Sequence, residues 1–111
     1  MNITHENIGE NRVVRLEGRL DAAAVRDHRD ELTSIADETN KWLIMNMDKV
    51  DFIDSSGLGL IVSLIRRTRE RRADLSVCNL SPQAKSLFEL TRMARIFSIY
   101  PTEESALQAA G

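Results

Sequence analysis

The chain has 111 residues, of which 42% are hydrophobic and 29% charged. This length and composition are those of one ordinary globular domain, residues 1–111, and they exclude a disordered chain. Fifteen Lys and Arg against 17 Asp and Glu leave a net charge of -2, which excludes a basic nucleic-acid binder or membrane-surface binder. We therefore expect the partners of this chain to be proteins.

Apolar residues alternate in some segments and recur every three or four residues in others, and cap or breaker residues separate these segments. The first pattern predicts strands and the second predicts helices. In chain order the predicted elements are an edge strand near 2–7, a strand at 12–17 ended by Gly18, a helix from Asp21 to about Glu38, a strand at 42–47, a helix from Ser55 to Arg72, a strand at 75–80, a helix at 83–90, a strand at 96–100 and a helix from Thr102 to about Ala109.

Strands that alternate with helices indicate an α/β domain. The connections after Gly18 and Ile53 are helical crossovers, so the strands that they join should be parallel, whereas the short first strand could be antiparallel. The predicted fold is a mixed, mostly parallel sheet of four or five strands, packed with about four helices.

Signals for membranes, metals and disulfides are weak in this sequence. No apolar run approaches the roughly 20 residues of a membrane span, and the polar N-terminus lacks the pattern of a signal peptide, so we expect a cytoplasmic protein. The single Cys78 cannot form an internal disulfide and suits a buried strand position. His5 and His28 lack metal-ligand spacing, and we expect neither a metal nor a cofactor.

The segment Asp51–Leu60 joins a predicted strand to a predicted helix. Asp54 and Ser55 are both good N-cap residues, and the first N–H groups and the dipole of a helix favour negative charge there. A phosphate on Ser55 could therefore be accommodated without unfolding, although the alternative interpretation is that Ser55 or Asp54 is only an ordinary cap. The apolar residues that follow at helical spacing are Leu58, Ile61, Val62 and Ile65.

Other chemistry at this junction is poorly supported. A hydrolase elbow needs glycine two residues before the serine, where Ile53 stands, and no histidine is placed as its base. A dinucleotide loop needs a third glycine where Val62 stands, and there is no Walker loop. Gly57 and Gly59 indicate close helix packing or the approach of a partner. A phosphoryl group on Ser55 would have to come from another protein that holds ATP.

The junction and its context resemble the STAS-domain anti-sigma factor antagonists, which are bacterial partner-switching proteins. The resemblance covers nearly the whole chain, and the run Asp-Ser-Ser-Gly-Leu-Gly is its specific part. The chain departs from many members at 71–73, where Arg-Arg-Ala replaces a Gly-rich turn. The matching segments are Gly18-Arg19-Leu20-Asp21, Phe52 through Gly59, and Ser81-Pro82 through Leu90.

The resemblance implies that the serine directly after Asp54, which is Ser55, is phosphorylated by an anti-sigma serine kinase and dephosphorylated by a PP2C-type phosphatase. The unphosphorylated form would sequester the kinase. We expect this chain to be a monomer or a weak dimer. Leu60 and Leu64 point away from the main apolar stripe on a helical wheel, so they either contact the partner or are covered by another element. The expected partner-facing residues are Asp21, Asp54, Ser56, Gly57, Leu58, Leu60 and Leu64.

Two alternatives belong to other functional classes. A non-switching STAS subunit of a transporter or scaffold assembly would need no phosphorylation, but the intact run from Asp54 to Ser56 favours the switch. A small enzyme would show turnover that depends on Ser55, and we expect none.

Overall fold

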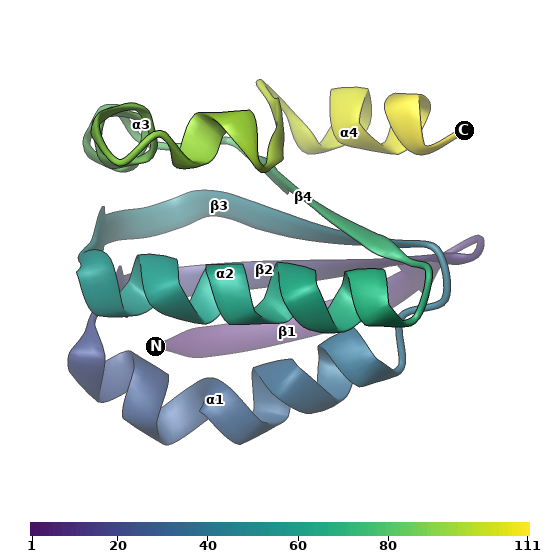
Figure 1. Cartoon of the computed structure of the whole chain (residues 1–111), viewed down its shortest axis with the longest axis horizontal. Coiled ribbons are helices and arrows are strands. Elements are labelled where there is room, and N and C mark those ends of the chain that lie inside the picture. Colours follow the sequence, from purple (N-terminus) through teal and green to yellow (C-terminus); the bar gives the residue numbers. More distant parts are fainter.

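The computed structural model describes residues 1–111 and consists of one five-stranded sheet and the helices that cover it (Figure 1). None of its helices combines the length and the apolar character needed to cross a bilayer. The elements are β1 (Asn2–Ile8), β2 (Asn11–Leu20), α1 (Ala22–Asp37), β3 (Trp42–Ile53), α2 (Ser55–Glu70), β4 (Asp74–Cys78), α3 (Pro82–Leu90), the short 3-10 helix η1 (Met93–Arg95), β5 (Ser98–Tyr100) and α4 (Glu103–Ala110).

The strands lie in the order β1-β2-β3-β4-β5, so each strand pairs with its neighbour in the sequence. The hairpin β1–β2 is antiparallel, and the three pairs that follow are parallel. The prediction of a mixed, mostly parallel α/β sheet is confirmed. Because parallel crossovers are right-handed, a sheet that grows in one direction carries all its crossover helices on one face.

The packing agrees with that rule. The larger core cluster joins the buried residues of α1, α2 and α3 to one face of the sheet. A smaller cluster on the other face joins Val13, Ile44 and Cys78 to Ala106 of α4. Burial in this second cluster raises the pKa of the Cys78 thiol to about 12, so the thiol stays protonated and Cys78 serves as a small apolar residue, as predicted.

Two strands are longer than predicted, and both extensions lead to the same end of the sheet. Gly18 does not end β2: it adopts φ +116, which favours glycine, and an irregularity in the register lies between it and Arg19. β3 continues past Met47 to Ile53 because Val50 and Ile53 are buried. The charged residues Asp48, Lys49 and Asp51 obscure this pattern in the sequence.

Candidate functional site

The carboxyl ends of β2 and β3 bring two helix starts together. Leu20 and Ile53 are register partners, and each is followed by an aspartate that caps a helix, Asp21 for α1 and Asp54 for α2. The backbone N–H of Asp54 donates to the carbonyl of Leu20 at 3.4 Å. In Figure 1, α1 and α2 both begin at this end of the sheet. Open α/β sheets form their sites at this edge.

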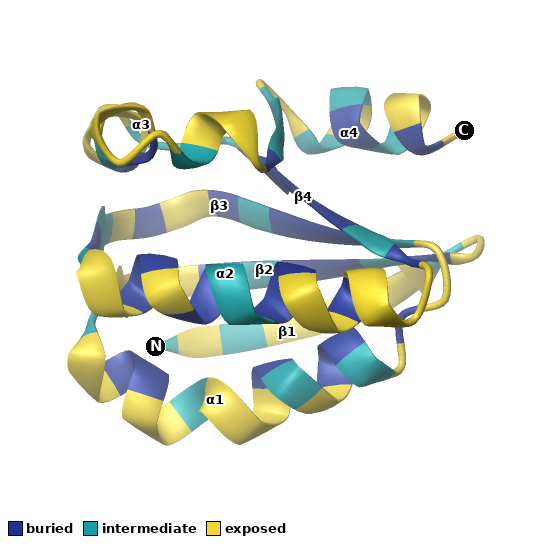
Figure 2. Cartoon of the chain, viewed as in Figure 1, coloured by how far each residue is buried: buried dark blue, intermediate teal, exposed yellow.

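Asp54, not Ser55, is the cap of α2. The Asp54 carboxylate accepts a hydrogen bond from the Gly57 N–H at 2.9 Å, and its backbone is extended. Ser55 is therefore the first residue of the helix, and both Ser55 and Ser56 are exposed. In Figure 2 the start of α2 has the colour of exposed residues. Of the two residues that could cap this helix, Asp54 is the one that does, and Ser55 is left exposed to solvent.

The start of α1 carries a similar cap with an added cation. The Asp21 carboxylate accepts from the Ala24 N–H at 3.1 Å and lies 3.5 Å from Arg19 Nε. The Ala24 hydrogen bond first, and Arg19 second, lower the pKa of Asp21. The Arg19 guanidinium also lies 4.2 Å from the centre of the Phe52 ring on β3. Arg19 lies in the segment 18–21 that the sequence analysis singled out, although no role was expected for it.

The two glycines of the junction have different surroundings. A Cβ added to Gly57 would lie 2.2 Å from the Leu20 carbonyl oxygen, so a side chain there would displace α2 from β2. A Cβ on Gly59 would meet nothing within 4 Å, and Gly59 is exposed. Gly57 therefore permits close packing, whereas Gly59 leaves an open surface on the first turns of α2.

The structure contradicts partner contact through Leu60 and Leu64, whose exposed fractions are 1% and 0%. The reason is that α2 packs on β3 and β4 and beside α1, so Leu60 and Leu64 join the larger core cluster together with the main apolar stripe. Gly57 and Leu58 are also core residues, with Leu58 6% exposed. Of the expected partner-facing residues, only Asp21, Asp54 and Ser56 reach the surface beside Ser55.

Gln83, the second residue of α3, also belongs to this site, and the sequence analysis missed it. Its side-chain amide forms two hydrogen bonds with the backbone of Ile53, accepting from the N–H at 3.0 Å and donating to the carbonyl at 2.8 Å. The residues are 30 positions apart, so no local pattern signals the contact. Its one sequence cue is the position directly after Ser81-Pro82.

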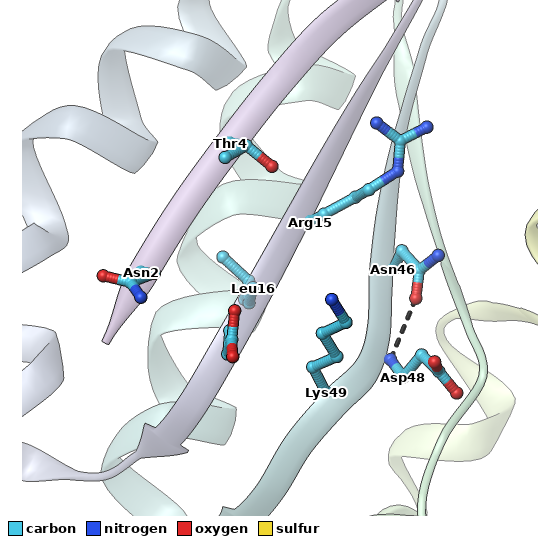
Figure 3. Close-up of a pocket in the computed structure, with 8 residues that line it drawn as sticks. Asn2, Thr4, Arg15, Leu16, Asn46, Asp48 and Lys49 are labelled. Carbon is cyan, nitrogen blue, oxygen red and sulfur yellow. Dashed lines mark hydrogen bonds between the residues drawn. The ribbon is translucent and has the colours of Figure 1, made fainter.

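A shallow hollow of about 210 Å³ lies elsewhere, over β1, β2 and β3 (Figure 3). Its lining is polar apart from Leu16 and includes none of the predicted site residues. At its rim the Arg15 guanidinium forms a two-bond ion pair with Glu103 of α4, at 2.9 Å for each bond. This pairing lowers the pKa of Glu103 and attaches α4 to the sheet. The hollow has no direct connection to Ser55.

Comparison with known proteins agrees with this geometry. The family model described as "STAS domain" matches residues 2–106. The chain belongs to the STAS domain family. Its STAS domain is 30% identical over 98 residues to the anti-sigma F factor antagonist of Paenibacillus polymyxa, which covers 86% of this chain and 82% of that protein. The resemblance inferred from the sequence is confirmed at the level of the family.

Two solved structures similar to this STAS domain describe one relative in two states. The anti-sigma factor antagonist SpoIIAA in its unphosphorylated form is 26% identical, with a TM-score of 0.74 over 97% of this chain and 96% of that chain. The Bacillus cell fate determinant SpoIIAA in the phosphorylated form is also 26% identical, with a TM-score of 0.75 over 99% of this chain and 100% of that chain. This chain therefore resembles both forms of that protein about equally.

Proposed function

We propose that this chain is an anti-sigma factor antagonist that works as a phosphorylation switch. The unphosphorylated form binds an anti-sigma factor that is a serine kinase, phosphorylation of Ser55 releases it, and a PP2C-type phosphatase resets the switch. The observation that carries the proposal is the exposed Ser55 directly after the capping Asp54. Support also comes from relatives described as anti-sigma factor antagonists, one of them solved in a phosphorylated form.

The start of α2 can hold a phosphate. The first N–H groups of a helix have no partners within the helix. In α2 the Gly57 N–H is taken by the Asp54 carboxylate and the Leu58 N–H by the Asp54 carbonyl. The N–H groups of Ser55 and Ser56 have no acceptor within the helix, and they lie at the positive end of the helix dipole. A phosphate on Ser55 would thus find donors within its own turn.

The same phosphate would change the charge and the shape of the surface that a partner binds. It would add about -1.5 to -2 charges directly after Asp54, at the end of the sheet that also carries the Asp21 carboxylate. A partner surface that fits small neutral groups, such as the exposed Ser56 and Gly59, would then face charge and added bulk. Burial of an unpaired phosphate against such a surface would cost several kcal/mol, which is enough to release the partner.

The remaining parts of the proposal follow from this mechanism. ATP is supplied by the partner kinase, and the whole chain, residues 1–111, acts as one cytoplasmic STAS domain that is a monomer or a weak dimer. It binds no cofactor, metal, nucleic acid or membrane and has no catalytic activity of its own. The non-switching alternative gains no support from the geometry, because it gives no role to an exposed serine at a helix start.

The test begins with affinity capture of the serine kinase from the host lysate by the unphosphorylated chain. The captured kinase, purified and supplied with ATP, should phosphorylate Ser55, as located by mass spectrometry of peptides. Ser55→Ala should abolish the modification, whereas the matched control Ser56→Ala should retain it. Modification confined to Ser56, or none at all, would overturn the assignment.

A further inference from the structure

The edge of β3 that faces β4 lacks a strand partner near Ser55. β4 pairs with β3 only from Trp42 to Asn46, where the last register pair is Asn46 with Cys78. β3 then continues for seven more residues to Ile53, along which β2 is its only neighbouring strand. Buried peptide groups need hydrogen-bond partners, and Ile53 is 0% exposed. The end of β3 therefore requires a partner from outside the sheet.

Gln83 supplies that partner. A glutamine side chain ends in a primary amide, which carries the same donor and acceptor as a peptide group. Its Nε2 donates to the Ile53 carbonyl at 2.8 Å, and its Oε1 accepts from the Ile53 N–H at 3.0 Å. On the opposite edge, the Asp54 N–H donates to the Leu20 carbonyl. The last peptide groups before Ser55 are thus held from both sides.

The helix that carries Gln83 is itself well anchored. Ser81 Oγ caps α3 by accepting from the Ala84 N–H at 3.1 Å, and Pro82 occupies the first helical position. Ala84 and Phe88 are buried, and the Phe88 ring packs edge-on against another ring of the core. Because the backbone of α3 is fixed, the Gln83 side chain places the end of β3 at a defined position.

We propose that Gln83 is a positioning residue for the Ser55 switch. Its side-chain amide replaces a strand at the open edge of β3 and holds the peptide group of Ile53, from which Asp54 and Ser55 follow. Both side-chain hydrogen bonds of Gln83 go to Ile53, so Gln83 acts on Ser55 through the backbone. This inference rests on the proposed phosphorylation of Ser55, and it links α3 to the start of α2. A change that shifts α3 would therefore alter how Ser55 is presented to a kinase.

The experiment compares Gln83→Glu and Gln83→Ala with the matched control Gln108→Glu, which alters an exposed glutamine on α4. By NMR, hydrogen exchange of the Ile53 amide should be at least about tenfold faster in Gln83→Ala than in the wild type. In Gln83→Glu the introduced carboxylate can accept from the Ile53 N–H but cannot donate to the carbonyl. Protonation restores the donor, so the Ile53 amide shift should return toward its wild-type position as the pH falls from 7 to 4.

The functional measurement uses the serine kinase captured as described above. Phosphorylation of Ser55, measured at a temperature at which every variant is folded, should be about tenfold slower in both Gln83 variants and unchanged in Gln108→Glu. Wild-type rates in the Gln83 variants, or an Ile53 amide insensitive to them, would overturn the positioning role while leaving the proposed function intact. A wild-type chain that is not phosphorylated on Ser55 would overturn both.

Discussion

The starts of α1 and α2 are two similar helix ends with different surroundings. Asp21 and Asp54 cap them in the same way, at the ends of neighbouring strands. At α1 the carboxylate has a nearby cation, Arg19, and three alanines follow it in the sequence. At α2 no ion pair is formed, and two exposed serines follow. A capped helix start is common and by itself indicates no function. The α2 start is a candidate switch because an accessible serine follows a carboxylate that forms no ion pair.

The largest effect on stability is expected where α2 approaches β2. Gly57→Ala should destabilise the chain by about 1–3 kcal/mol, because the added Cβ would overlap a backbone oxygen and force α2 to move. Gly59→Ala, the matched control two residues on, should stabilise by up to about 1 kcal/mol, because its Cβ enters open space and alanine favours helix. Urea denaturation measures both. Equal effects at the two glycines would show that α2 is not closely packed on β2.

A smaller effect on stability is expected at Asp54, where two substitutions distinguish its capping hydrogen bond from its negative charge. Asp54→Ala should destabilise the chain by about 1 kcal/mol, because the Gly57 N–H loses its acceptor. Asp54→Asn should lie close to the wild type, since asparagine caps about as well as aspartate. Both values come from the same denaturation experiment. If Asn were as harmful as Ala, the negative charge of Asp54 would be what stabilises the helix start, contrary to this account.

The smallest effect concerns the cation at α1. The pKa of Asp21 lies below its ordinary value of 3.8, chiefly because of the Ala24 N–H and secondarily because of Arg19. A lowered carboxyl pKa gives stability that is present above the ordinary value and is lost as the pH falls through the folded-state pKa. Arg19→Ala should raise the pKa only part of the way back, as followed by NMR titration. A complete return to 3.8 would mean that Arg19, not the cap, sets the Asp21 pKa.

Much of this arrangement could be predicted from local patterns. Apolar periodicity and cap residues locate the helices within a few residues, and the start of α2 is correctly placed at Ser55. Two features depend on contacts between distant segments and could not be predicted in this way. A helical wheel of α2 cannot reveal that its neighbours bury Leu60 and Leu64. Likewise, the hydrogen bonds of Gln83 to Ile53 exist only once α3 is packed.

The most direct test of the switch compares the chain phosphorylated on Ser55 with the unmodified chain, in a calorimetric titration against the captured kinase and in thermal melts. A loss of about 2.8 kcal/mol would weaken binding about a hundredfold, and we expect a loss at least this large. The melting temperature should change little, because the N–H groups and dipole of α2, worth roughly 0.3–1 kcal/mol, offset repulsion from Asp54. Phosphorylation that unfolds the domain, or that leaves kinase affinity intact, would contradict a switch based on charge at the surface.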